Sequence, residues 1–205
     1  MKKMLLVALA AMAIAPSVMA KKDPAAPKTA TAAPAEEIHW LTSVEELQMK
    51  MQQQPKKVIV DMYTGWCGWC KKMDAETYTN PSVVKYINNN YYALKLDAER
   101  KDTINFQGKQ FFFVPEYKTN GFALELLKDH LARGGQLMYP QTVIMMENFQ
   151  NPNPISGYLT VPQLEPVLTY FGDNAFRRQS WDQYSKTYVP RWGGAAQPAT
   201  APPGH

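Results

Sequence analysis

A pair of cysteines separated by two residues, placed just after an apolar strand, constrains this chain more than any other feature. The run Lys57 to Tyr63 (KVIVDMY) is rich in β-branched residues, as a buried central strand is, and Cys67-Gly68-Trp69-Cys70 follows where a helix is expected to start. The chain must therefore fold so that this strand ends beside a helix N-terminus. The 205 residues hold no other cysteine, so the two thiols act as a pair.

The helix start gives the first thiol a specific chemistry. Its sulfur faces unpaired backbone N–H groups and the positive end of the helix dipole, so we expect a lowered pKa and predict that Cys67 is the nucleophile. Cys70, one turn further in, is predicted to be more shielded and to resolve a mixed disulfide. A metal site is the weaker alternative, because the three histidines are scattered. A purely structural disulfide is also weak, because so short a loop constrains the unfolded chain little.

The two ends of the chain differ in composition from its middle. Residues 1–20 have a basic start, an apolar run and small residues at the end, which predicts a secretory signal peptide; a retained membrane anchor is the alternative. Residues 21–37 predict an Ala/Pro-rich flexible linker, and residues 193–205 a disordered tail. The expected folded domain is 38–192. Its charges are interspersed, which argues against nucleic acid as a partner, and no later segment is apolar enough to span a membrane after signal cleavage.

Strand and helix signals alternate within the expected domain. The predicted elements are a helix opened by Ser43 and Glu46 and ending before Pro55, the strand 57–63, a helix from Cys67 to Thr77, a helix over 82–88, strands over 91–97 and 141–146, a short antiparallel strand over 155–159, and a last helix begun by Thr160. Such an order, ending in a hairpin and a helix, predicts an α/β fold with a mixed central sheet flanked by helices.

The ordered motifs resemble the thioredoxin superfamily over about residues 40–172. Asp61 in its strand, followed by Trp66 and the Cys-Gly-Trp-Cys-Lys turn, resembles the family's buried acid and active-site helix, and Tyr139-Pro140 resembles its cis-proline loop. The phrase Cys-Gly-Trp-Cys-Lys-Lys-Met is most similar to secreted thioredoxin-related proteins and to the C-terminal, thioredoxin-like domain of DsbD-type electron carriers. The resemblance implies a thioredoxin fold and a periplasmic or secreted thiol-disulfide oxidoreductase.

Several residue roles follow from this resemblance. Asp61 lies in an apolar strand, where burial would raise its pKa and suit it to exchange a proton with Cys70; a water-exposed strand end is the alternative. Lys95 either tunes this carboxyl or is simply solvated. Because proline disrupts strands, a cis Tyr139–Pro140 bond is favoured over an ordinary trans turn.

The resemblance also implies what the site binds. Its substrate-binding residues are expected to be Trp66, Gly68, Trp69, Tyr139 and Pro140, although both tryptophans could be simple packing. The implied partners are protein disulfides and a membrane-embedded dithiol electron donor, and we expect a monomer. No cofactor beyond the cysteine pair is needed. Reduction or isomerisation is favoured, but Gly-Trp replaces the Gly-Pro of reducing thioredoxins, which leaves the direction of electron flow open. A protein-binding or redox-sensing module with little turnover is the competing class.

Residues 99–138 are an expected insertion between the active-site helix and the cis-proline strand. The segment 107–117 is aromatic, and 122–133 has a helical pattern. Two interpretations stay open. Either its apolar side chains cover the sheet as extra core, or the insertion builds a wall beside the cysteine turn and selects substrates. The side chains in question are Phe111, Phe112, Phe113, Leu124, Leu127 and Leu131.

Overall fold

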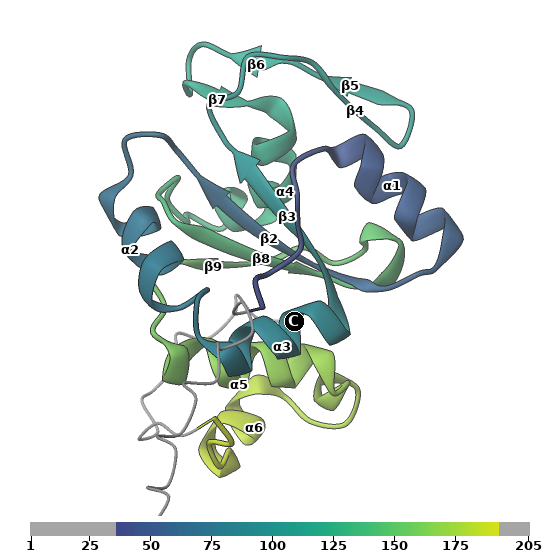
Figure 1. The fold of residues 1–205 in the computed structure, drawn as a ribbon. Coiled ribbons are helices and arrows are strands. Elements are labelled where there is room, and N and C mark those ends of the chain that lie inside the picture. Colours follow the sequence, from purple (N-terminus) through teal and green to yellow (C-terminus); the bar gives the residue numbers. More distant parts are fainter. Residues whose placement is uncertain (1–35, 193–205) are drawn as a thin grey trace, which may run out of the picture. The chain divides into compact units, whose positions relative to one another are not determined.

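Residues 36–192, which the computed structural model describes, contain a five-stranded mixed sheet with the strand order β1-β3-β2-β8-β9 (Figure 1). The predicted signal peptide, all but the last two residues of the predicted linker, and the predicted tail lie outside the described residues. The strands of this sheet are β1 (Trp40–Leu41), β2 (Lys57–Tyr63), β3 (Tyr91–Asp97), β8 (Gln141–Met145) and β9 (Asn153–Ser156).

The strand directions match the predicted mixed sheet. Strands β1 and β2 both run parallel to β3, whereas β8 is antiparallel to β2 and β9 is antiparallel to β8. Strand β2 is central and hydrogen-bonded on both sides, and all its residues before Tyr63 are buried. Its C-terminal end therefore holds the following loop against a rigid scaffold.

Helices cover both faces of the sheet. Apolar side chains of α1 and α4 pack on one face, while those of α2, α3 and α5 pack on the other, with α6 outside α5 (Figure 1). The helices are α1 (Val44–Gln53), α2 (Gly68–Glu76), α3 (Pro81–Asn90), α4 (Gly121–Ala132), α5 (Val161–Gly172) and α6 (Trp181–Thr187), and the short 3-10 helices are η1 (Glu147–Phe149) and η2 (Ala175–Arg177). This arrangement confirms the predicted thioredoxin fold.

Polar side chains set where these helices begin. The Ser43 hydroxyl accepts the Glu46 N–H at 3.2 Å, which confirms the predicted start of α1. Asn80 and Asn120 cap α3 and α4 in the same way. Cys67 itself is the N-cap of α2. Each cap satisfies backbone donors that the first helical turn leaves unpaired.

Some predicted elements differ in place or were not foreseen. Strand β9 begins at Asn153, two residues before the predicted start at 155, and includes Pro154; β9 is an edge strand, where a proline costs no ladder hydrogen bond. The two-residue strand β1 and the helix α6 were not predicted.

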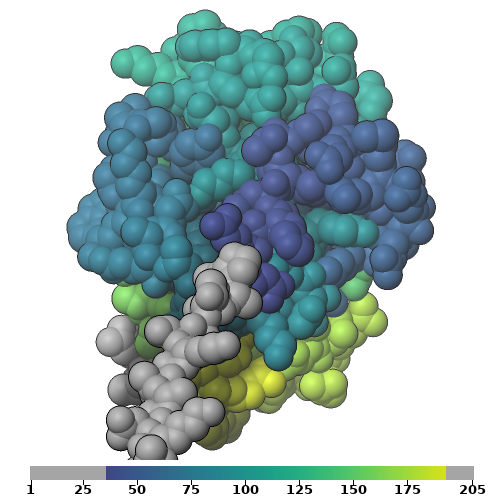
Figure 2. Space-filling model, viewed as in Figure 1, coloured from purple at the N-terminus to yellow at the C-terminus, as the bar shows by residue number. Residues whose placement is uncertain are grey.

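The insertion contains two hairpins followed by α4. The hairpins are β4 (Ile104–Phe106) with β5 (Lys109–Phe111), and β6 (Phe113–Val114) with β7 (Thr119–Asn120). Figure 2 shows the teal insertion as the upper rim of this view, beside the blue segment that carries the cysteine turn.

Only part of the insertion serves as extra core. Leu127 is buried, and Phe111 and Leu131 pack against the core, whereas Phe112 is mostly exposed. Leu124 is only partly buried, and the buried residues of α4 form adjacent pairs one turn apart. These residues are Phe122, Ala123, Leu126 and Leu127.

Candidate active site

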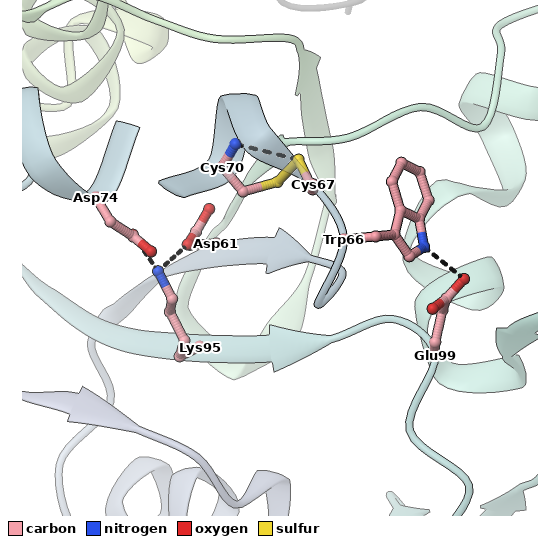
Figure 3. The surroundings of a disulfide bond; sticks show 7 residues. All are labelled: Asp61, Trp66, Cys67, Cys70, Asp74, Lys95 and Glu99. Carbon is pink, nitrogen blue, oxygen red and sulfur yellow. Dashed lines mark hydrogen bonds and ion pairs between the residues drawn. A yellow bond between two sulfur atoms is a disulfide. The ribbon is translucent and has the colours of Figure 1, made fainter. Parts of the chain in front are cut away.

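Cys67 and Cys70 form a disulfide at the start of α2 (Figure 3). The Sγ atom of Cys67 accepts a hydrogen bond from the Cys70 backbone N–H at 3.1 Å, and the Cys67 N–H donates to the Thr64 carbonyl at 3.1 Å. In the reduced protein, this backbone donor and the helix dipole would stabilise a thiolate on Cys67. The local structure therefore suits the first sulfur to nucleophilic attack.

The exposure of the two cysteine residues in the disulfide does not show the predicted difference. Both Cys67 and Cys70 are 3% exposed, so Cys70 is not the more shielded residue in the disulfide form. Glycines stand on both sides of the first cysteine. Gly65 and Gly68 are exposed, and a Cβ atom built on either would meet open space. An incoming disulfide can therefore approach Cys67 over the bare backbone at these glycines.

Asp61 lies beneath the disulfide, in the middle of the sheet. Its side chain is buried, and burial raises its pKa to about 6 although the positive charge of Lys95 opposes the shift. In Figure 3, one carboxylate oxygen faces Lys95 and the other points toward Cys70. The latter, Oδ1, has no hydrogen-bond partner among the described residues. The predicted burial of Asp61 and the predicted direction of its pKa shift are confirmed.

Lys95 joins Asp61 to a second carboxylate. Its Nζ atom lies 2.5 Å from Asp61 Oδ2 and also forms an ion pair with Asp74, which α2 contributes. Aromatic rings surround this ammonium group, with Trp40 centred 5.1 Å and Tyr63 5.3 Å away. Lys95 is thus an ion-paired residue at the site and not a freely solvated lysine.

A cavity of about 420 Å³ opens on the outer side of this ion-pair group. Trp40, Asp74, Tyr78 and Lys95 are among its lining residues. The Lys95 side chain is 17% exposed, whereas that of Asp61 is 2% exposed. Lys95 and Asp74, which line this cavity, therefore separate the buried carboxyl from it.

The Tyr139–Pro140 bond is cis, as predicted. Pro140 is buried, and its carbonyl accepts the Gly157 N–H at 2.8 Å. The Tyr139 ring packs edge-on against Trp66, with the ring centres 6.2 Å apart. The loop before β8 thus lies beside the turn that carries the cysteines.

Trp66 and Trp69 are 68% and 60% exposed, which excludes simple core packing. The indole N–H of Trp66 donates to the Glu99 carboxylate at 3.1 Å, and the Trp69 ring lies 5.6 Å from that of Tyr158. Two exposed aromatic side chains therefore come just before and just after Cys67 in the chain, and each contacts a different part of the fold.

Neither a metal centre nor a membrane helix is found among the described residues. No group of three or more His, Cys, Asp or Glu side chains there is arranged to hold a metal ion. None of the helices in that part of the chain is both long and apolar enough to cross a bilayer.

The sequence profile of the DsbH-type thioredoxin family, described as "Protein of unknown function, DUF255", matches residues 28–130. The chain belongs to this family. The match includes β2, the cysteine turn and Lys95, and it ends before the cis-proline loop. Membership of this DsbH-type family, together with a Cys-x-x-Cys pair at disulfide distance, supports thiol-disulfide redox chemistry.

Individual relatives match shorter stretches. The thiol:disulfide interchange protein DsbD of Haemophilus ducreyi is 43% identical over 44 residues, which cover 21% of this chain and 8% of that protein. An uncharacterized Caenorhabditis elegans protein is 26% identical over 68 residues, which cover 33% of this chain and 9% of that protein. This DsbH-type chain thus spans less than a tenth of either curated relative.

Solved structures give longer but more distant matches. The oxidised C-terminal domain of Neisseria meningitidis DsbD is 19% identical, with 66% of this chain and 98% of that chain covered and a TM-score of 0.39. A structure named DsbH Oxidoreductase is 14% identical, with 75% and 96% covered and a TM-score of 0.42.

The structure adds residues to the site that the sequence did not indicate. Asp74, Glu99, Thr119 and Tyr158 each contact a predicted site residue or its ion-pair partner. Asp74 had a detectable signal, because it follows Cys70 by one helical turn and so shares its side of α2. The other three depend on how the insertion and β9 pack, which no local pattern encodes.

Proposed function

We propose that this DsbH-type protein is a thiol-disulfide oxidoreductase that acts on protein disulfides in the periplasm or outside the cell. One observation carries the proposal: the Cys67–Cys70 disulfide lies at a helix N-terminus, and Asp61, a buried carboxyl with a pKa of about 6, points one oxygen toward Cys70 (Figure 3). A group that changes charge near neutral pH beside a resolving thiol is what proton exchange in this chemistry needs.

The reduced protein would react in two steps. The Cys67 thiolate attacks one sulfur of a substrate disulfide, forms a mixed disulfide, and releases the other substrate sulfur as a thiolate that takes up a proton. Cys70 then passes its proton to Asp61 and attacks the Cys67 sulfur. This attack releases the second substrate thiolate, which receives the proton from Asp61, and closes the Cys67–Cys70 disulfide. The substrate disulfide gains two electrons, which the cysteine pair loses.

The oxidised pair must be reduced before another cycle. A second dithiol has to supply the two electrons, and we assign this role to a membrane-embedded donor. Reduction or isomerisation of client disulfides is the proposed direction. The predicted signal peptide and the short match to DsbD support this location and partner.

The exposed side chains around Cys67 form the proposed substrate surface. Trp66 and Trp69 are exposed at the cysteine turn, and Gly68 leaves open space beside the first cysteine. The backbone of Tyr139, held by the cis bond to Pro140, would pair with an extended substrate segment. No metal or organic cofactor takes part in the proposed reaction.

Trapping of mixed disulfides tests the proposal. In a Cys70→Ala variant the second step is blocked, so client proteins should remain bound to Cys67 through disulfides that a reductant releases. Cys67→Ala is the matched control, because it keeps one thiol but lacks the proposed nucleophile. Absence of adducts on Cys70→Ala during oxidising growth, or equal adducts on both variants, would contradict the proposal.

The low exposure of both cysteine residues favours one other function, a redox-sensing or protein-binding module with little turnover. Thiol alkylation distinguishes the two. An oxidoreductase requires that Cys67 in the reduced protein alkylates much faster near neutral pH than an ordinary thiol. A slow thiol, together with no reduction of insulin disulfides, would support the module.

A further inference from the structure

We propose that the β6–β7 hairpin is a specificity element of the redox site, with Thr119 as a positioning residue that orients Tyr139 toward extended polypeptide disulfides. This inference rests on the proposed oxidoreductase function and deepens it. The established family membership assigns no role to this hairpin.

A backbone ladder ties the hairpin to the end of the active-site strand. The Ala98 N–H donates to the Tyr63 carbonyl at 2.8 Å, and the Asn120 N–H donates to the Ala98 carbonyl at 2.6 Å. Tyr63 is the last residue of β2, three positions before Trp66. The ladder therefore extends from the cysteine turn to β7.

Asn120 makes this attachment rigid. It is fully buried, its amide group donates to the carbonyls of Arg100 and Asp102, and its Oδ1 accepts the Phe122 N–H. One side chain thus joins the first turn of the insertion to the start of α4. The position of β7 beside the site is consequently set by packed and satisfied groups, not by a loose loop.

The hydroxyl of Thr119 contacts the cis-proline loop directly. Thr119 is buried, and its Oγ1 donates to the Tyr117 carbonyl at 2.9 Å and lies 3.2 Å from the Tyr139 hydroxyl. A threonine hydroxyl has only one proton to donate. Tyr139 must therefore be the donor in the second bond, so Thr119 fixes the direction of the tyrosine ring.

The oriented ring reaches the exposed rim of the site. Tyr139 packs edge-on against Trp66, and Glu99, at the start of the insertion, holds the Trp66 indole. Met138, next in the loop, is also exposed. Insertion residues thus contact Tyr139 and Trp66, two aromatic side chains of the cysteine turn and the neighbouring cis-proline loop.

This geometry favours one class of substrate. An extended polypeptide has side chains on both sides of its cysteine and can contact the apolar rim while its disulfide meets Cys67. A small disulfide reaches the sulfur without touching the rim. The ordering of Tyr139 by Thr119 should therefore raise the rate with polypeptide disulfides and change the rate with small disulfides little.

Single-turnover kinetics test the inference. Reduced full-length protein is mixed with insulin or with hydroxyethyl disulfide, and the second-order rate constants are followed by tryptophan fluorescence. In Thr119→Val the ratio of the insulin constant to the hydroxyethyl disulfide constant should fall about fivefold, the size expected for one net hydrogen bond. Tyr139→Phe removes the same bond, so it should lower the ratio similarly, and the double variant should lower it no further.

Thr103→Val is the matched control, because Thr103 is an exposed threonine of the same insertion, and its ratio should equal that of the wild type. If the wild type is active but Thr119→Val and Tyr139→Phe both keep its ratio of rate constants, the inference is overturned and the proposed function is not. So does an equal loss on both substrates, which would indicate a merely structural role. A wild type inactive on both substrates would overturn the proposed function and the inference with it.

Discussion

Asp61 and Lys95 stand directly opposite each other on the adjacent parallel strands β2 and β3, and their side chains form an ion pair of 2.5 Å. The pKa of Asp61 is nevertheless raised to about 6, so the attraction to Lys95 does not compensate for the loss of water around the carboxyl. Burial therefore outweighs the nearby positive charge. The site holds an acid whose charge changes within the pH range in which its thiols would react.

Asp61→Asn should stabilise the protein at neutral pH. A carboxyl whose pKa is higher in the folded than in the unfolded state contributes stability that is complete below the unfolded pKa, near 4, and is lost as the pH rises through about 6. Asparagine has no such loss, so the gain in the free energy of unfolding should be on the order of 3 kcal/mol at pH 7.5 and shrink toward pH 4. Urea unfolding of the oxidised protein at both pH values measures it.

Asp129→Asn serves as the control for this experiment. Asp129 is exposed on α4, so the substitution should leave the pH dependence of stability close to that of the wild type. Parallel stability curves for wild type and Asp61→Asn would show that the buried carboxyl carries no pKa shift on folding.

The two partners of the ion-pair group should move the pKa of Asp61 in opposite directions. Lys95→Met removes the positive charge that lowers it, so the pKa should rise above 6. Asp74→Asn removes a negative charge that raises it, so the pKa should fall. Carbon NMR titration of the Asp61 carboxyl measures both variants. Shifts of the same sign would contradict the electrostatic account of this site.

Features encoded by adjacent residues were predictable from the sequence. The run of β-branched residues before Cys67 marked β2, and Tyr139-Pro140 marked the cis bond. Asp61 was identifiable because a lone acid in an apolar strand must either be buried with a raised pKa or lie at an exposed end. Each of these inferences needed only local chemistry and the order of the motifs.

Features set by the packing of distant segments were not predictable. Asp74 of α2 meets Lys95 of β3, and Thr119 of the separate β6–β7 hairpin meets Tyr139, only because the fold brings these distant segments together. Helix α4 shows the same limit. Leu127 is buried, as one of the two open interpretations expected, whereas Leu124 is only partly buried.

Gly68→Ala should separate substrate docking from folding. Gly68 is the first residue of α2, has no positive φ angle, and faces open space where a methyl group would stand. The free energy of unfolding should therefore stay level or rise by up to about 1 kcal/mol, since alanine favours helices. The rate with insulin disulfides should fall, because the methyl group stands beside Cys67 in the path of the substrate. A clear loss of stability would instead show that the backbone requires glycine.

The C-terminal end of the described chain depends on one buried carboxylate, Glu165 of α5. Its Oε1 accepts hydrogen bonds from the Tyr188 hydroxyl at 2.7 Å and from the backbone N–H groups of Arg191 and Trp192. Charged acceptors form stronger hydrogen bonds than neutral ones. Glu165→Gln should therefore lower the free energy of unfolding by about 1–2 kcal/mol, and the amides of Arg191 and Trp192 should exchange hydrogen faster.

The matched control for this last variant is Glu116→Gln, at an exposed position in the turn between β6 and β7, which should change neither quantity. Glu165 touches no residue of the cysteine site, so the rate with hydroxyethyl disulfide should equal that of the wild type in Glu165→Gln. Unchanged exchange at Arg191 and Trp192 would show that the packing of Trp192 against Tyr86, with ring centres 5.2 Å apart, holds the segment without the carboxylate. Faster exchange at these two amides, with the remaining amides unaffected, would place the loss in this segment and leave the sheet that supports Asp61 intact.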